Sequence, residues 1–365
     1  MTGDIAPLAL TMGDPAGIGP ELALAAWRDR TPGVPFVIFA PPVVLAGAAK
    51  RAGLTAPIIE TDPAGARAAF GKGLPVVPLK NAVEDAPGRS SAANAAATIE
   101  SIERAVEALR QGHVRAVVTN PIAKATLYQA GFKYPGHTEY LGALAEAWGA
   151  PAFPVMMIWS ETLAVVPVTI HIPLADVARA LTAELIIKTG RVVDRDMRAR
   201  FRVTRPRLAV AGLNPHAGEG GAMGREEITI IGPAIETLRG EGIDIVGPLP
   251  ADTMFHPKAR ARYDVALTMY HDQGLIPFKS LSGGEGVNFT AGLPMVRTSP
   301  DHGTAFDIAG KNKADATSFL TALYTCLDII RNRQEYDENP SNPMRKMGAA
   351  VMGNAEDEKL EGTRG

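Results

Sequence analysis

Three of the seven histidines in this 365-residue chain, His171, His216 and His271, follow apolar stretches that have the composition of buried strands. In open α/β sheets the carboxyl ends of parallel strands meet at one edge, and ligands bind there. Three imidazoles at such an edge, with room left for substrate oxygens, make an open site for a divalent metal ion. The pattern favours a shared metal site. The alternative is that each histidine is a structural residue at the end of its strand.

Residues 263–297 contain several polar and charged side chains that could take part in binding or catalysis. An apolar run at 265–270 stops at His271 and Asp272, where a strand would deliver both side chains into a crevice. An imidazole, a carboxylate, an ammonium and a guanidinium within one segment suit a small anionic substrate and a metal ion. The alternative is a strand-to-helix turn with solvated charges. The other candidates of this segment are expected on loops that follow the strand: Lys279, Asn288 and Arg297.

A second candidate site begins at the Gly/Pro-rich stretch 131–136, which leads into a predicted helix at His137 and Thr138. The free backbone amides of a helix start bind anions, which favours a ligand here. The alternative is that Thr138 only caps the helix. The glycine-rich segment 13–21 has the spacing G-x-x-x-G-x-G, which differs from the dinucleotide-binding and P-loop patterns. Its glycines let the backbone approach either a ligand or another segment closely.

The elements that must position these residues alternate between strands and helices, so the sequence predicts an α/β fold built from βαβ units. The clearest helix spans 91–112, where apolar residues recur at helical spacing and a glycine ends the pattern. Strands are predicted at 8–12, 35–40, 74–77, 114–119, 154–159, 163–169, 207–213, 243–246 and 265–270. Further helices are predicted at 20–28, 43–52, 226–238, 305–309 and 317–330, with shorter ones near 124 and before 148.

Composition excludes several classes of protein. A formal net charge of −2 provides no basic surface for nucleic acid or anionic membranes. Cys326 is the single cysteine, so any metal must be held by histidines and carboxylates, as suits a reducing compartment. No stretch has the length of a membrane span, and the first residues lack the basic region of a signal peptide. The sequence therefore predicts a soluble, cytoplasmic protein.

The length of the chain is large for a single core, so two lobes or one large α/β domain with a split core are expected. Beyond Arg331 the residues are polar and charged without sustained periodicity, which predicts a disordered tail. The predicted organisation is a catalytic α/β unit over 1–330, with uncertain lobe boundaries and a cleft between the lobes, followed by a tail over 331–365.

Six segments carry a resemblance to one family, in family order along residues 8–330. They are MGDPAGIGPE, TNPIAKATLYQAGFKYPGHTEYL, GLNPHAGEGG, GPLPADT, MYHDQGL and GVNFTAGLPMVRTSPDHGTAFDIAG. They resemble the motifs of the 4-hydroxythreonine-4-phosphate dehydrogenases, a family of pyridoxal phosphate (vitamin B6) biosynthesis. The resemblance implies a two-lobed α/β fold with largely parallel sheets, similar to isocitrate and isopropylmalate dehydrogenases and unlike a GxGxxG Rossmann domain. It also implies a homodimer with its active site at the subunit interface.

The resemblance also implies roles for particular residues. The ligands of one divalent ion, zinc, magnesium or cobalt, would be His171, His216 and His271. The substrate contacts would be His137, Thr138, Lys279, Asn288 and Arg297. The catalytic candidates are Lys279, Asp252 and Asp272, while the cofactor-binding residues stay unassigned. One departure is Ala222, which stands where the family loop usually has histidine. Another is the variable stretch 280–285 after Lys279.

The implied reaction is the NAD- or NADP-linked oxidation of 4-phosphooxy-L-threonine to 2-amino-3-oxo-4-phosphooxybutanoate. This β-keto acid then loses its carboxylate to give 3-amino-2-oxopropyl phosphate. Relatives with the same motifs act on 4-phosphorylated threonate or erythronate or on aromatic dihydrodiols, which are the alternative substrates. Two other classes are a metallohydrolase, in which the metal activates water against a phosphoester, and a binding protein that has kept the fold.

Overall fold

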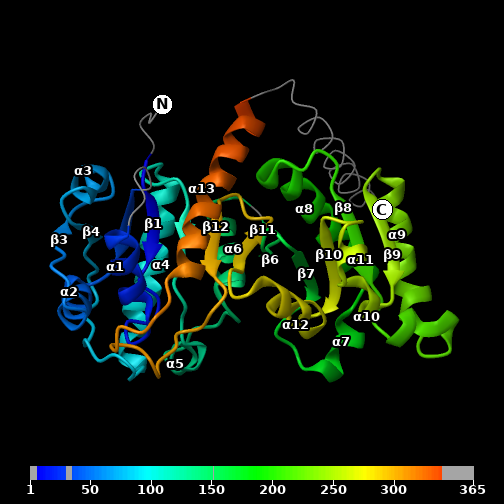
Figure 1. Ribbon diagram of the computed structural model, residues 1–365, viewed down its shortest axis with the longest axis horizontal. Coiled ribbons are helices and arrows are strands. Elements are labelled where there is room, and N and C mark those ends of the chain that lie inside the picture. The colour runs from blue at the N-terminus through cyan, green and yellow to red at the C-terminus, as the bar shows by residue number, and fades with distance from the viewer. Residues whose placement is uncertain (1–5, 30–34, 151, 339–365) are drawn as a thin grey trace. The chain divides into compact units, whose positions relative to one another are not determined.

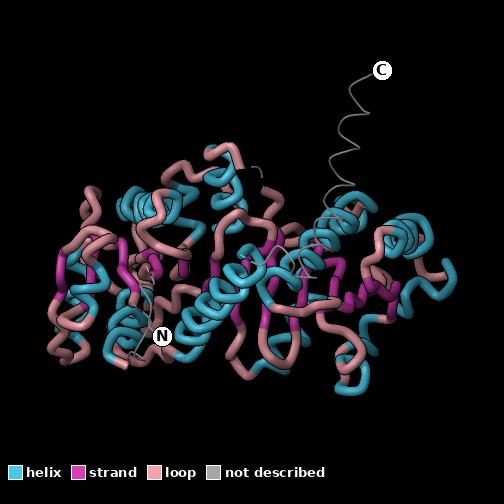
Figure 2. The backbone as a smooth tube through the Cα atoms, turned by 90° about the horizontal axis from the view of Figure 1, so that it is seen from above, coloured by secondary structure: helices cyan, strands magenta, loops and turns pink. Residues whose placement is uncertain are grey.

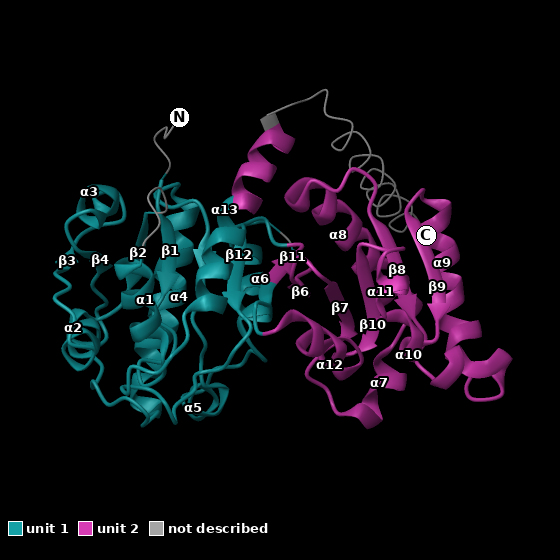
Figure 3. Ribbon diagram, in the orientation of Figure 1, with its two compact units in different colours: residues 1–152, 284–288, 293–327 teal, residues 153–283, 289–292, 328–365 magenta. Residues whose placement is uncertain are grey.

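The structure, a computed structural model, describes residues 6–29, 35–150 and 152–338. The chain divides into two compact units (Figure 3). Unit 1 contains residues 1–152, 284–288 and 293–327, and unit 2 contains residues 153–283, 289–292 and 328–365. Each unit is built from strands flanked by helices (Figure 1, Figure 2). The predicted α/β class with largely parallel strands is therefore confirmed.

The sheet of unit 1 has the strand order β3-β4-β2-β1-β5-β12, and every neighbouring pair in it is parallel. Parallel neighbours need crossover connections, which α1 to α4 supply. The strands are β1 (Leu8–Thr11), β2 (Phe36–Phe39), β3 (Ile58–Glu60), β4 (Leu74–Val77), β5 (Val117–Val118) and β12 (Arg297–Pro300). The helices are α1 (Gly19–Arg28), α2 (Pro42–Arg51), α3 (Ala66–Phe70), α4 (Ala95–Arg110), α5 (Lys124–Gln129) and α6 (His137–Ala147).

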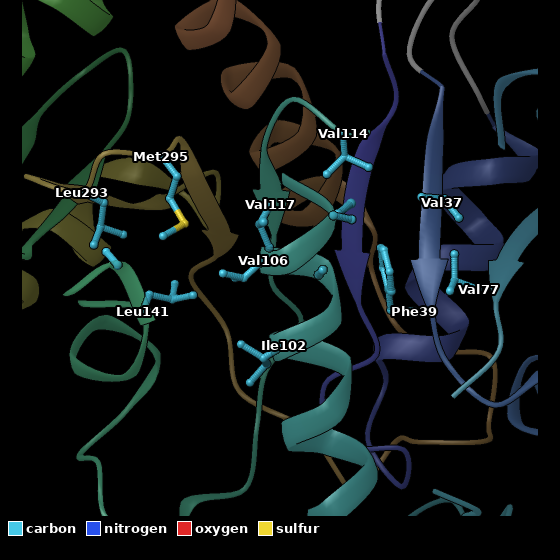
Figure 4. Packing of buried hydrophobic residues seen from close by; sticks show 14 of the residues in the cluster. Val37, Phe39, Val77, Ile102, Val106, Val114, Val117, Leu141, Leu293 and Met295 are labelled. Carbon is cyan, nitrogen blue, oxygen red and sulfur yellow. The ribbon is translucent and has the colours of Figure 1, made fainter. Parts of the chain in front are cut away.

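The core of unit 1 forms where α4 packs against β1, β2 and β5 (Figure 4). Ile102 and Val106 lie one turn apart on α4, and both are buried. They share a cluster with Val117 of β5 and Leu141 of α6. Burying each such side chain contributes about 1.5–3 kcal/mol. The helical spacing read from the sequence is thus the spacing that fills this core.

The sheet of unit 2 includes the strand order β6-β7-β10-β8-β9. The hairpin of β6 and β7 is antiparallel, as expected of two strands joined by a short turn, and the other neighbours are parallel. The strands are β6 (Val155–Trp159), β7 (Ala164–Thr169), β8 (Arg207–Ala211), β9 (Asp244–Leu249) and β10 (Val265–Tyr270). The helices are α7 (Leu174–Ala180), α8 (Ala183–Phe201), α9 (Gly232–Gly240), α10 (Ala251–Met254), α11 (Pro257–Arg260) and α12 (His271–Ser282).

Helix α8 has no counterpart among the predicted elements. Its buried face carries charges as well as apolar residues, so the usual apolar stripe of a helix is interrupted. Asp194 and Arg198 form a fully buried ion pair in which Nε and Nη2 each donate to a carboxylate oxygen at 2.8 Å. Asp196, also buried, accepts a hydrogen bond from the backbone N–H of Gly292 at 2.8 Å. Because these paired charges occupy positions on the buried face that are usually apolar, the sequence pattern did not indicate a helix here.

Three substrate-contact candidates were expected on loops, and this placement is wrong. Lys279 lies in α12, Asn288 in β11 (Val287–Ala291), and Arg297 begins β12. Gly286 precedes β11, and Gly292 follows it at the start of the short stretch that leads to β12. Strands of four or five residues bounded by such turn formers give little apolar signal.

Two further expectations need correction. Residues 305–309 form turns instead of a helix, with Ala305 at a left-handed φ of 47°. The last helix, α13 (Thr317–Glu338), continues past the predicted start of the tail, and Asn332 Nδ2 donates to the carbonyl of Arg200 at 2.8 Å. The rest of the predicted tail, 339–365, lies outside the described residues. None of the described helices combines the length and the apolar composition that crossing a membrane requires.

Candidate active site

Three neighbouring parallel strands of unit 2, β7, β10 and β8, end at the same edge of its sheet. Tyr270, the last residue of β10, is in register with Thr169, the last residue of β7. One predicted metal ligand follows each strand: His171 after β7, His271 directly after β10, and His216 after β8. The parallel register therefore brings the three histidine-bearing segments to the carboxyl edge of one sheet.

The imidazole rings of His171 and His271 are neighbours, with centroids 5.7 Å apart and planes inclined at 40°. A ring bound through one nitrogen to a tetrahedral zinc ion has its centroid about 3 Å from the metal, so two such rings stand roughly 5 Å apart. The observed pair is close to that separation and fits two nitrogen positions of a divalent ion. Both rings line a cavity of about 270 Å³, together with Thr169, Tyr270, Asp272 and four aliphatic side chains.

Asp272 sets the orientation of the His271 ring. Its Oδ1 lies 2.7 Å from His271 Nδ1, which leaves Nε2 as the nitrogen for a ligand. Gln273 braces the neighbouring strand ends, because its Oε1 accepts from the N–H of Met269 at 2.7 Å and its Nε2 donates to the carbonyl of Gly212 at 2.7 Å. The first turn of α12 is thereby hydrogen-bonded to the residue that follows β8, and the third histidine, His216, lies four residues further along the chain.

The segment that carries His216 has a left-handed backbone, since residues 216–220 all have positive φ and His216 itself has 52°. Such a conformation costs roughly 1–2 kcal/mol for each residue other than glycine, so surrounding contacts must hold it. Buried Glu227 provides them, accepting from the backbone N–H of Asn214 at 2.8 Å and from its Nδ2 at 3.0 Å. His171 is left-handed as well, with φ 51°. Two of the three predicted ligands thus occupy strained backbone, which is a frequent property of functional residues.

His216 does not join the other two imidazoles. Within the part of the chain that the structure describes, no three His, Cys, Asp or Glu side chains gather closely enough to hold a metal ion. The structure thus brings together His171, His271 and Asp272. Of the remaining candidates in unit 2, Asp252 is exposed in the first turn of α10, which contacts the His216 segment, and Lys279 is exposed on α12.

In unit 1 the substrate-contact candidates include the buried guanidinium of Arg297. Because β12 pairs with β5, this side chain reaches Thr119, whose Oγ1 accepts from Nε at 3.0 Å and from Nη2 at 2.5 Å. Arg297 is 2 % exposed, and burial lowers its pKa to about 9, while the charge of Glu139 opposes that shift. A cation removed from water in this way favours an anionic ligand.

Helix α6 begins at His137, as the sequence predicts, and its N-cap residue is Gly136 without any capping side chain. Thr138, which is buried, is therefore not the cap. Burial lowers the pKa of His137 well below its usual value near 6.5, and the charges of Arg297 and Lys124 add to that shift. His137 Nε2 is buried and has no hydrogen-bond partner in the described part of the chain. His137 is therefore a neutral imidazole whose Nε2 makes no hydrogen bond within the described residues.

Two charged residues near His137 were not among the candidates, Lys124 and Glu139. Both lie inside a motif that carried the family resemblance, but their types gave no separate signal. Glu139 Oε2 is buried without a hydrogen-bond partner among the described residues, and so is Oδ1 of Asn288 on β11. A buried acceptor left unpaired costs about 1–3 kcal/mol, so each such atom calls for an explanation.

The glycine-rich segment after β1 is packed by protein atoms. A Cβ at Gly13 would stand 2.6 Å from the carbonyl oxygen of Pro121, and one at Gly19 would stand 2.5 Å from that of Met12. Contacts this short leave room only for glycine. These glycines therefore allow one protein segment to approach another, which is one of the two roles that the sequence left open.

Comparisons with known proteins agree with the resemblance seen in the sequence. Residues 33–326 match the family model described as pyridoxal phosphate biosynthetic protein PdxA. The chain is 56 % identical over 328 residues to a 4-hydroxythreonine-4-phosphate dehydrogenase of Methylorubrum extorquens, covering 88 % of this chain and 94 % of that protein. It is 47 % identical over 335 residues to the enzyme of that name from Zymomonas mobilis, covering 91 % and 98 %.

A solved structure of 4-hydroxythreonine-4-phosphate dehydrogenase from Klebsiella pneumoniae is also similar. It has a TM-score of 0.77 and 37 % identity, and the match covers 89 % of this chain and 99 % of that one. These matches confirm the family that the six sequence motifs indicated.

The lowered pKa of His137 predicts a specific pH dependence of stability. Because its pKa is lowered in the folded state, the unfolded chain binds more protons below pH 6.5, and stability falls as the pH falls. At about pH 5.5 a histidine that stays neutral when folded contributes about 1.4 kcal/mol of this loss. Thermal unfolding of His137→Gln should therefore lose less stability between about pH 8 and about pH 5.5 than the wild type does. His113→Gln, at an exposed position, is the control. An unchanged pH dependence in His137→Gln would contradict the assignment.

Proposed function

Because this chain belongs to the PdxA family of pyridoxal phosphate biosynthetic proteins, we propose that it is a metal-dependent, NAD(P)-linked dehydrogenase of 4-phosphooxy-L-threonine. The product would be 2-amino-3-oxo-4-phosphooxybutanoate, which decarboxylates to 3-amino-2-oxopropyl phosphate. The observation that carries the proposal is the pair of imidazoles, His171 and His271, at a carboxyl strand edge in a chain whose relatives bear this enzyme name.

The residues at the strand edge suit the binding of a divalent ion such as zinc, magnesium or cobalt. His171 and His271 would hold it, and Asp272 would keep the His271 ring turned so that Nε2 faces it. When bound, such an ion supplies Lewis acidity that lowers the pKa of an alcohol, while NAD or NADP takes up the hydride. His216 is the proposed third ligand.

The chain's own residues would bind the substrate and move the proton. Arg297 offers a desolvated cation for phosphate or carboxylate, and neutral His137 offers Nε2 for a hydrogen bond to a substrate oxygen. Asp272 is engaged with His271, so we assign transfer of the hydroxyl proton to Asp252 or Lys279. Thr138 and Asn288 complete the proposed substrate contacts. The lobes of residues 1–330 form the proposed catalytic unit, and we place the enzyme in the cytoplasm.

We also propose that the enzyme is a homodimer whose metal site is completed by the partner. Two of the predicted ligands stand together within one chain, while His216 stands apart among the described residues. Two large apolar side chains that line the cavity are also exposed, Ile172 at 39 % and Leu174 at 70 %. Adjoining exposed apolar side chains are a feature of surfaces that bind a partner.

The substrate and reaction class can be tested with the purified protein, a divalent ion and each nicotinamide. We expect 4-phosphooxy-L-threonine to support cofactor reduction, and Arg297→Lys to lower kcat/KM by at least about tenfold, because an ammonium cannot reproduce a planar two-point contact. A melting curve of the variant checks its folding. Preference for 4-phosphoerythronate or a dihydrodiol would reassign the substrate, and phosphate release without cofactor reduction would indicate a hydrolase.

Sharing of the metal site can be tested by subunit complementation. Chains carrying His216→Ala are mixed with chains carrying His171→Ala under conditions that allow exchange. If the partner supplies His216, each mixed dimer has one intact site, and activity should return to about a quarter of the wild-type value, since half of the dimers are mixed. A mixture that stays inactive despite proven exchange would show that the metal ligands come from one chain.

A further inference from the structure

The side chain of Gln273 lies between the carboxyl ends of two neighbouring strands of unit 2, β10 and β8. The last paired residues of these two strands are Leu267 and Val210. On its other side, β10 stays paired with β7 as far as Tyr270. The end of β10 therefore leaves β8 while it remains attached to β7.

At the same edge of the sheet, β8 stays attached to its other neighbour, β9. Ala211 is in register with Leu249, and the N–H of Gly212 donates to the carbonyl of Leu249 at 2.8 Å. The register of this pair shifts between Ala209 and Ala211, and such an irregularity bends and twists a strand locally. The backbones of β10 and β8 are thus no longer paired at the edge that carries the three histidine-bearing segments.

The amide group of Gln273 bridges these two strand ends. Its Oε1 accepts from the N–H of Met269, and its Nε2 donates to the carbonyl of Gly212, each at 2.7 Å. A parallel ladder joins neighbouring strands through single N–H···O=C bonds. Here two hydrogen bonds and an amide group stand in the place of one such bond. The bridge therefore holds the strand ends together at a larger separation than a continued ladder would.

Close packing fixes both sides of this bridge. Gly274, the next residue of α12, has no room for a side chain, because a Cβ there would stand 2.7 Å from Thr268 Oγ1 of β10. A Cβ at Gly212 would stand 2.8 Å from the Cα of Ala217, the residue after His216. The first turn of α12 thus lies directly on β10, and the residue at the other side of the bridge packs against the turn that carries the third histidine.

We propose that Gln273 is a positioning residue of the metal site, whose amide sets the spacing between His271, two residues before it, and the turn that carries His216. This inference rests on the proposed function, because it requires that both histidines bind a metal ion. In a homodimer that shares its ligands as proposed above, these two histidines of one chain belong to different sites. A change in their spacing then displaces one ligand at each site.

The competing explanation is that Gln273 only stabilises the fold. If so, loss of the amide lowers the melting temperature and leaves the affinity for a metal ion unchanged. If the amide positions the histidines, its loss also weakens metal binding. Replacing residues that orient metal ligands typically weakens metal binding by about ten- to a hundredfold.

The test measures cobalt affinity by competition with a chelator, and the visible absorption of bound cobalt, in Gln273→Glu and Gln273→Met. Glutamate is nearly isosteric, but its carboxylate cannot donate to the Gly212 carbonyl, and methionine cannot reproduce the amide contacts. We expect both variants to bind cobalt at least about tenfold more weakly than the wild type does. The absorption spectrum, which reports the ligand geometry, should change as well. A melting curve of each variant confirms folding.

Asp264→Asn is the matched control, because Asp264 joins the opposite ends of the same two strands. Its Oδ2 accepts from the backbone N–H of Arg207 at 2.8 Å, and its Oδ1 accepts from Arg207 Nη2 at 2.8 Å. This variant should lower the melting temperature but keep cobalt affinity within about threefold of the wild-type value, since it lies away from the histidines. Gln273 variants that bind cobalt as Asp264→Asn does would overturn the proposal.

A further variant, His271→Ala, separates this proposal from the proposed function. If cobalt affinity falls in His271→Ala but not in the Gln273 variants, the metal site stands and Gln273 has only a structural role. If cobalt affinity is unchanged in His271→Ala, the histidines do not form the site, and both proposals fail.

Discussion

The parallel register of β7, β10 and β8 is the constraint on which the candidate metal site depends. All three strands are largely buried, and all three end at the same edge of the sheet. Polar residues that directly follow these strands therefore lie near one another without long loops. His271 is the first residue of α12, whereas His171 and His216 both have a left-handed backbone conformation. The sheet sets the position of these segments, and the left-handed backbone at two of the histidines must be held by the surrounding contacts.

Buried charges on α8 of unit 2 are paired, whereas unit 1 has buried polar atoms without a partner among its described residues. On α8 of unit 2, Asp194 and Arg198 form two hydrogen bonds with each other. Each charge of this pair therefore has a partner, and the pair has a structural role. In unit 1, Glu139 keeps a buried oxygen without a partner among the described residues, and His137 keeps a buried nitrogen in the same condition. Buried polar atoms without a partner are rare in folded proteins, so these two atoms call for an explanation that the ion pair on α8 does not need.

Much of this arrangement could be predicted from the sequence, for physical reasons. The strands that end before His171 and His271 are continuous apolar runs, and α4 repeats its apolar residues at helical spacing. Asn288 and Arg297 were misplaced on loops because strands as short as β11 and β12 give little apolar signal beside glycines. Lys279 was misplaced because α12 contains Gly274 and Pro277, which are poor helix formers. Helix α8 was missed because charges interrupt its buried face. The unpartnered oxygen of Glu139 could not be predicted, because no sequence pattern reports that a buried atom lacks a hydrogen-bond partner among the described residues.

If the strand-end histidines bind one divalent ion, a count of the imidazole ligands around that ion will show it. X-ray absorption spectra of the cobalt-loaded protein report the number of imidazoles around the metal. We expect three imidazoles in the wild type, two in His216→Ala and two in His271→Ala, with weaker metal binding in both variants. A cobalt ion surrounded by oxygen ligands alone, or an imidazole count that neither substitution changes, would contradict it.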